Sequence, residues 1–232
     1  MDTLTPAKIT RLHPSAGATM TGAEIIVQVL ADEGVDTIFG YSGGAILPTY
    51  DAVFRYNEDH RRNGAEPMPL IVPANEQGAG FMAAGYARAS GRVGVVIVTS
   101  GPGATNCVTP VRDCMADSIP IVVICGQVST GAIGSDAFQE APVTAIMGSV
   151  AKHVFLVTDP TRLEATMRTA FEIARTGRFF DPGHQRCGIA EVQFGHADHH
   201  APAIRRRQLP QVIQNGRDRK STRLNSSHVA LS

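Results

Sequence analysis

Apolar residues recur in two alternating patterns along residues 20–178. One pattern has apolar residues three or four positions apart, as in helices, and the other is a short unbroken apolar run, as in strands buried on both faces. The predicted strands are 36–40, 69–73, 93–99 and 119–126. One predicted helix begins at Thr21 and ends before Gly34, and a second carries residues 46–54. Three more predicted helices span 76–89, 103–115 and 160–176. This alternation predicts an α/β fold of three layers, α/β/α, with a mostly parallel sheet.

The alternating pattern stops after residue 178, which predicts a boundary there. Residues 1–20 form a flexible N-terminal arm in this interpretation, 21–178 form the folded domain, and 179–232 form an irregular tail. The tail carries eight Lys and Arg against four Asp and Glu, although the whole chain has a net charge of zero. Within it, only 188–194 resembles a strand, and 220–232 resembles translated vector or adaptor sequence. A frameshift or assembly error near codon 179 would explain the change, and a genuine divergent tail is the alternative.

Composition narrows the class of protein. At 43% hydrophobic residues the chain can build a core, and no apolar run reaches membrane-spanning length. The four cysteines have no C-x-x-C spacing, so we expect buried thiols in a reducing cytoplasm. The histidines of 196–200 are of a residue type that binds metal ions, but they lie in the irregular tail, and we predict no metal site there. Neither a membrane nor a nucleic acid is expected as a partner.

Two neighbouring segments carry candidate chemistry. Glu76 opens a helix rich in glycine and alanine, and each helical glycine costs about 1 kcal/mol unless close packing is required. Without that context, Glu76 would be an ordinary surface glutamate favoured by the helix dipole. Ser100 to Gly103 form a turn between a strand and a helix, where backbone N–H groups could hold a phosphate. Asn106 stands where a dinucleotide-binding motif requires its third glycine, so a purely structural turn is the other interpretation.

These segments, with 39–48 and 136–141, resemble the pyrimidine-binding domain of thiamine-diphosphate enzymes. Within that family the chain is most similar to the large catalytic subunit of acetolactate (acetohydroxyacid) synthases, over about residues 20–178. One departure is Ser42, where the family usually has proline. The resemblance implies the thiamine-diphosphate-binding fold, with six parallel strands. It also implies that a strand following residue 178 inserts between two others, so the sixth strand is missing here or is replaced by 189–194.

The resemblance also assigns roles to individual residues. Glu76 would hydrogen-bond N1′ of the cofactor's aminopyrimidine and shuttle the proton that lets the cofactor deprotonate itself, and Gln139 would be the second catalytic residue. The implied cofactor-binding residues are Tyr41, Gly43, Gly44, Ala45, Glu76, Thr99, Pro102 and Asn106. The implied substrate-pocket residues are Phe138, Gln139 and Lys152. For Lys152, a solvated basic surface is an equally good interpretation.

The implied reaction joins two 2-ketoacids with loss of CO2, pyruvate with pyruvate or 2-ketobutyrate, as the first common step of branched-chain amino acid synthesis. The implied cofactors are thiamine diphosphate, Mg²⁺ and FAD, and the implied assembly is a homodimer or homotetramer with a possible small regulatory subunit. Neither a Gly-Asp-Gly…Asn motif for Mg²⁺ nor a flavin-contacting domain occurs here, so the fragment is expected to be inactive alone. The alternatives are another thiamine-diphosphate carboligase or decarboxylase, similar to glyoxylate carboligase, and a non-catalytic remnant.

Overall fold

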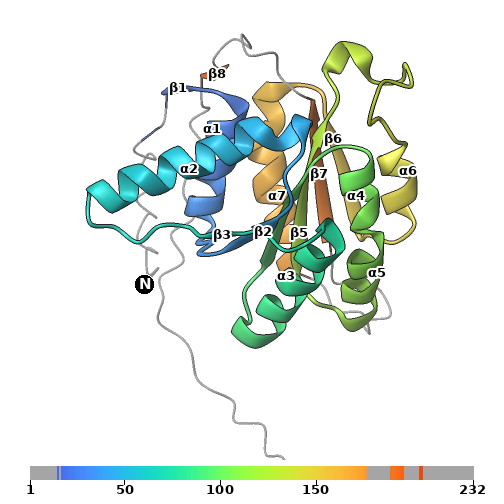
Figure 1. The fold of residues 1–232 in the computed structure, drawn as a ribbon, viewed down its shortest axis with the longest axis horizontal. Coiled ribbons are helices and arrows are strands. Elements are labelled where there is room, and N and C mark those ends of the chain that lie inside the picture. Colours follow the sequence, from blue (N-terminus) through green and yellow to red (C-terminus); the bar gives the residue numbers. More distant parts are fainter. Residues whose placement is uncertain (1–14, 16, 177–188, 196–203, 206–232) are drawn as a thin grey trace, which may run out of the picture. The chain divides into compact units, whose positions relative to one another are not determined.

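A six-stranded, wholly parallel sheet forms the centre of the computed structural model (Figure 1). The structure describes residues 15, 17–176, 189–195 and 204–205. Contacts within residues 18–206 define one structural unit. The strands lie in the order β3 (Leu70–Ile71), β2 (Ile38–Gly40), β4 (Gly94–Val98), β5 (Ile121–Gln127), β7 (Ile189–Gly195) and β6 (His153–Val157). Separately, β1 (Thr19–Met20) pairs antiparallel with β8 (Ile204–Arg205).

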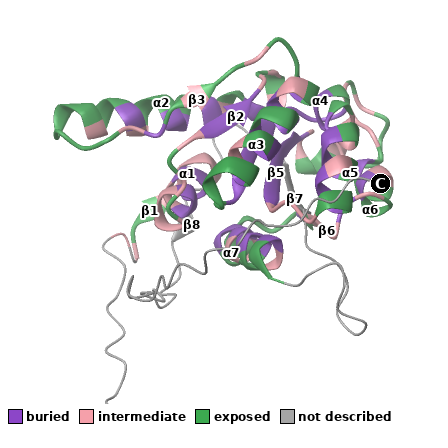
Figure 2. Cartoon of the chain, turned by 90° about the horizontal axis from the view of Figure 1, so that it is seen from below, coloured by how far each residue is buried: buried purple, intermediate pink, exposed green. Residues whose placement is uncertain are grey.

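Helices cover both faces of the sheet, which confirms the predicted three-layer fold. One layer holds α1 (Gly22–Asp32), α2 (Leu47–Arg62) and α7 (Leu163–Arg175). The other layer holds α3 (Glu76–Ser90), α4 (Pro102–Asn106), α5 (Val108–Asp117) and α6 (Val143–Gly148). Three short 3-10 turns are η1 (Gly44–Ile46), η2 (Thr130–Ala132) and η3 (Pro160–Arg162). Figure 2 shows the buried strands between helices whose outward faces are exposed.

The central strands are apolar on both faces because each face packs against a helical layer. In β4, Val95 and Ile97 belong to the core beneath α1, α2 and α7, whereas Val96 and Val98 belong to the core beneath α3 to α6. Successive strand residues point to opposite faces, so an unbroken apolar run supplies both cores at once. The sequence pattern therefore has a direct structural cause.

The predicted helix at 103–115 is wrong in one respect, because the chain breaks into α4 and α5 at Cys107. Pro110 explains the break. Inside one continuous helix it would lack the N–H that bonds the carbonyl of Asn106, and its ring would clash with that carbonyl. Restarting the helix at Val108 puts Pro110 in a first turn, where no intrahelical N–H bond is needed.

The tail contributes an interior strand to the sheet. β7 lies between β5 and β6 and pairs in parallel with both, in the place where the family resemblance implied a sixth strand. The replacement of that strand by 189–194, one of the two expected outcomes, is confirmed. β6 and α6 are additions that the apolar pattern did not predict.

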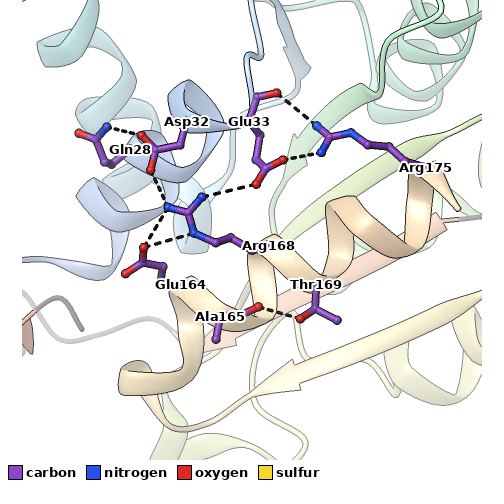
Figure 3. Close-up of polar contacts among 8 residues, drawn as sticks. All are labelled: Gln28, Asp32, Glu33, Glu164, Ala165, Arg168, Thr169 and Arg175. Atoms are coloured by element: carbon purple, nitrogen blue, oxygen red, sulfur yellow. Dashed lines mark hydrogen bonds and ion pairs between the residues drawn. The ribbon is translucent and has the colours of Figure 1, made fainter. Parts of the chain in front are cut away.

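An ion-pair cluster joins α1 to α7 (Figure 3). The Arg168 guanidinium donates to Asp32 at 2.6 Å and to Glu164 at 3.0 Å, and it lies 3.5 Å from Glu33. Arg175 completes the cluster by donating to Glu33 at 2.5 Å. Because the Asp32 and Glu164 side chains are largely buried, losing the arginine would strand charges out of water. The cluster holds together two helices that are distant in sequence.

Candidate functional site

The carboxyl ends of β2, β4 and β5 bring three chain segments to one edge of the sheet. In an open parallel sheet this edge is where ligands bind, because loops and helix N-termini converge there. Glu76, the first residue of α3, lies at this edge. The helix starts there because the side chain of Asn75 accepts a hydrogen bond from the N–H of Gly78 at 2.7 Å. Local capping chemistry thus fixes the position of Glu76.

Glu76 is a buried carboxylate, with 8% of its surface exposed. The side-chain amide of Asn106, the last residue of α4, donates to Glu76 Oε2 at 2.9 Å. The Cys107 thiol donates to the Glu76 backbone carbonyl at 3.8 Å, which ties the α4–α5 junction to the start of α3. A buried carboxylate is costly without such a partner. Asn106 therefore determines which of the two carboxylate oxygens remains available for chemistry.

Thr99, directly after β4, is the residue around which the glycine-rich turns pack. Its hydroxyl accepts a hydrogen bond from the N–H of Ala45 at 3.3 Å. A Cβ at Gly43 would lie 2.5 Å from Thr99 Cβ, and one at Gly103 would lie 2.8 Å from Thr99 Cγ2. Real side chains do not approach so closely, so both turns require glycine in order to contact Thr99. The turn after β2 and the turn after β4 thus form one packed unit.

Gly101 joins this unit to the loop that carries the predicted substrate residues. Its φ of +53° is in the region that favours glycine, and an added Cβ would lie 2.3 Å from the carbonyl oxygen of Gln139. Gln139 itself has a φ of +61°. Neighbouring Phe138 is 89% exposed. The backbone of Gln139 is therefore held against the turn next to Glu76.

The Glu140 side chain organises the same loop. Its carboxylate accepts hydrogen bonds from the N–H groups of Gly134 and Ala137. These backbone donors lower the pKa of Glu140, with Gly134 the larger cause. The charged form of Glu140 thus holds the loop that presents Phe138 and Gln139.

We predict that Gly101→Ala destabilises the fold and displaces the 134–140 loop. The clash with Gln139 and the loss of an allowed positive φ should together lower the free energy of unfolding by more than ~2 kcal/mol. Gly85→Ala is the matched control, because a Cβ there meets nothing within 4 Å and alanine favours the helix by up to ~1 kcal/mol. Urea unfolding of both variants measures the difference, and equal stability would contradict this account of Gly101.

The structure brings most of the predicted site residues to this edge. Tyr41 is half-buried, and its backbone N–H donates to the Ile97 carbonyl at 3.2 Å. Pro102 is exposed at the first position of α4, and Gly44 is exposed at the start of η1. Together with the residues above, the group at the carboxyl edge comprises Tyr41, Gly43, Gly44, Ala45, Glu76, Thr99, Pro102, Asn106, Phe138 and Gln139.

Lys152 is the exception. It precedes β6, and its ammonium donates to the carbonyl of Ile173 at 2.8 Å and to that of Thr176. Those carbonyls lie at the C-terminal end of α7, where unsatisfied acceptors favour a cation. Because α7 runs back from the carboxyl edge after β6, Lys152 lies at the amino edge of the parallel sheet, opposite Glu76.

Sequence reasoning missed Gly101 and Glu140 as organisers of the site. For Gly101 a signal was present, since a glycine between a strand and proline often has a positive φ. For Glu140 no local signal distinguishes a carboxylate that accepts two backbone N–H groups from a solvated one. Across residues 17–176, no cluster of three His, Cys, Asp or Glu side chains could hold a metal ion. No helix in the part of the chain that the structure describes is long and apolar enough to cross a membrane.

The fold and the site define a class of cofactor-binding domain, and comparison with known proteins gives the family. Residues 20–147 match the model of the thiamine pyrophosphate enzyme N-terminal TPP binding domain, so the chain belongs to that family. This confirms the resemblance drawn from the motifs.

Several curated relatives of the chain are acetolactate synthases. The catalytic subunit from mitochondria of Saccharomyces cerevisiae is 51% identical over 159 residues, which are 68% of this chain and 22% of the relative. The large subunit of Corynebacterium glutamicum is 46% identical over 175 residues, 75% of this chain and 26% of the relative. The isozyme 2 large subunit of Escherichia coli is 46% identical over 159 residues, which are 68% of this chain and 27% of the relative. The chain spans about a quarter of the length of these relatives.

Proposed function

We propose that this chain is the pyrimidine-binding part of an acetolactate synthase large catalytic subunit. The observation that carries the proposal is the buried carboxylate of Glu76, held through one oxygen by Asn106 at the carboxyl edge of the sheet. Identities of 46% to 51% to acetolactate synthases over two thirds or more of the chain support it. Because the chain spans only part of those relatives, the activity belongs to a longer polypeptide or assembly.

The residues at the site fit thiamine diphosphate. The aminopyrimidine of this cofactor is a flat aromatic ring with a basic nitrogen. It needs one carboxylate beside that nitrogen and neighbouring backbone without side chains that would fill the space of the ring. Glu76 supplies the carboxylate, and a Cβ at Gly103 would stand 3.6 Å from its Oε1. Around Gly44 no atom lies within 4 Å of an added Cβ, so the turn after β2 leaves room on that side. A carboxylate lined by glycine residues therefore suits the binding of an aminopyrimidine.

In this proposal the chain's own residues bind, orient and move one proton. When bound, thiamine diphosphate supplies the carbanion chemistry of 2-ketoacid decarboxylation. Glu76 would hold and release a proton at its carboxylate, and the hydrogen bond from Asn106 to Oε2 would leave Oε1 for the cofactor. Tyr41, Gly43, Gly44, Ala45, Thr99 and Pro102 would form the wall beside the ring.

The substrate side of the site is proposed from the 134–140 loop. Exposed Phe138 would cover the reacting carbons, and Gln139 would offer a polar contact to the substrate because its backbone is anchored on Gly101. Lys152 is bound to the end of α7 at the opposite edge, so within this chain it would not touch the same substrate molecule. Its role at a pocket entrance stays a prediction for an assembled enzyme.

The proposed reaction condenses pyruvate with pyruvate or 2-ketobutyrate and releases CO2. Mg²⁺ and FAD would be held by parts of the enzyme outside the described residues, which offer no cluster of three metal ligands. A homodimer or homotetramer and a small regulatory subunit are the proposed partners. A cytoplasmic location also stays a prediction, and two fungal relatives are mitochondrial. Another thiamine-diphosphate 2-ketoacid decarboxylase or carboligase, similar to glyoxylate carboligase, is the alternative activity.

A chimera tests the activity. Residues 20–176 replace the matching segment of the Corynebacterium glutamicum large subunit, which is 46% identical to this chain. We expect acetolactate formation from pyruvate, dependent on added thiamine diphosphate, within about tenfold of the unmodified subunit, because one fixed geometry serves both chains. The unmodified subunit, purified in parallel, is the control. A folded chimera that binds the cofactor but yields only decarboxylated product would favour the alternative.

A further inference from the structure

The phenol of Tyr50 is buried without a hydrogen-bond partner among the described residues. Tyr50 lies in the first turn of α2, shortly after the turn at Gly43 and Gly44, and is 5% exposed. An unsatisfied buried hydroxyl costs about 1–3 kcal/mol, and phenylalanine would fill the same space without that cost. The hydroxyl therefore calls for an explanation beyond packing.

The Tyr50 hydroxyl lies at the same edge of the sheet as the candidate site. A Cβ at Gly40, the last residue of β2, would stand 2.7 Å from the phenol oxygen and 2.4 Å from the carbonyl of Ile97. Ile97 is two residues before Thr99. The phenol oxygen is therefore close to the ends of β2 and β4, and it reaches that position from the layer that contains α1, α2 and α7.

Glu76 approaches Thr99 from the opposite layer. Gly103 is the link, because its added Cβ would contact both Thr99 Cγ2, at 2.8 Å, and Glu76 Oε1, at 3.6 Å. Tyr50 and Glu76 thus lie on two sides of the strand end at Thr99. Within the described residues, Asn106 bonds Glu76 Oε2, and no hydrogen bond is made to Oε1.

Electrostatics agree with this geometry. Burial raises the pKa of Tyr50 strongly, and the negative charge of Glu76 raises it further. The phenol therefore stays protonated at any working pH and remains a donor. A rotatable O–H dipole in a low-dielectric interior turns its hydrogen toward a nearby carboxylate.

We propose that Tyr50 is a positioning residue for Glu76. Its buried O–H attracts the carboxylate from the α2 side, while Asn106 holds it from α4. The Asn106 hydrogen bond and the Tyr50 O–H dipole together keep Oε1 directed into the site. The catalytic consequence rests on the proposed function, but the effect on the position of the Glu76 side chain does not.

The first test uses the 232-residue chain without cofactor. The side-chain amide of Asn106 reports the position of Glu76 Oε2, and its ¹⁵N–¹H resonance is identified by its loss in Asn106→Ser. We expect Tyr50→Phe to shift this resonance while the melting temperature stays equal or rises, because an unsatisfied hydroxyl is removed. Tyr56→Phe is the matched control, since Tyr56 lies on the same helix but stacks on His60, and it should leave the resonance unchanged.

The second test measures turnover in the active chimera. Tyr50→Phe should lower kcat by roughly tenfold, a part of the full acid–base contribution, with KM unchanged. An Asn106 resonance that does not move in Tyr50→Phe overturns the proposal, and so does an unchanged kcat. If the resonance moves while the chimera is inactive with either residue at position 50, the positioning role stands and the proposed function fails.

Discussion

Glu76→Gln is expected to lower acetohydroxyacid formation by the chimera by roughly 10²-fold or more, the usual loss when a general acid–base is removed. The amide has nearly the same shape as the carboxylate and can still accept the hydrogen bond from Asn106, so the fold should survive. It cannot take up and release a proton at that position. The rate of hydrogen–deuterium exchange at C2 of the bound cofactor, followed by NMR, measures the lost step directly.

Exposed Glu66 provides the control for this substitution. Glu66→Gln removes the same charge from the same polypeptide at a loop position, and turnover should stay within a factor of about two, since surface substitutions change little. Cofactor exchange at the original rate in Glu76→Gln would remove the basis for the proposed chemistry. A loss of thermal stability in Glu76→Gln alone would instead mean that the carboxylate serves the fold.

Ending the chain after residue 178 is expected to abolish cooperative folding. Strand β7 pairs over seven residues with β5 and over five with β6, so its removal leaves backbone donors and acceptors on both neighbours without partners. The two strands would also lose their link to each other and expose apolar faces. Such a loss exceeds the ~5–15 kcal/mol that stabilises an ordinary domain. Thermal unfolding followed by circular dichroism should show no sharp transition for residues 1–178.

A chain ending after residue 206 is the matched control, because it keeps β7 and β8. It should melt cooperatively and resist protease as the 232-residue chain does. Equal melting curves for the two shortened chains would contradict the central place of β7.

Local chemistry in the sequence was enough to predict the elements that carry the site. Helix α3 begins with the Asn75 cap and ends at Gly91, whose φ of +69° suits glycine, and both signals can be read within a few residues. The strands β4 and β5 follow from unbroken apolar runs, because a sheet covered on both sides favours apolar residues at successive positions, and only Gln127 at the end of β5 is polar. The position of Glu76 at the start of α3 follows from the same local rules.

Only the tertiary structure decided which of these residues meet. Asn106 bonds Glu76 across 30 residues, and Gly101 contacts Gln139 through a loop whose shape depends on Glu140. Lys152 lies at the far edge because its partners are the terminal carbonyls of α7. These contacts depend on strand order and on the paths of crossover connections, which are set by packing between distant segments. Capping, turns and apolar runs act over a few residues, so the sequence determined most of the elements, although not β6 and α6, and the assembled sheet determined the site.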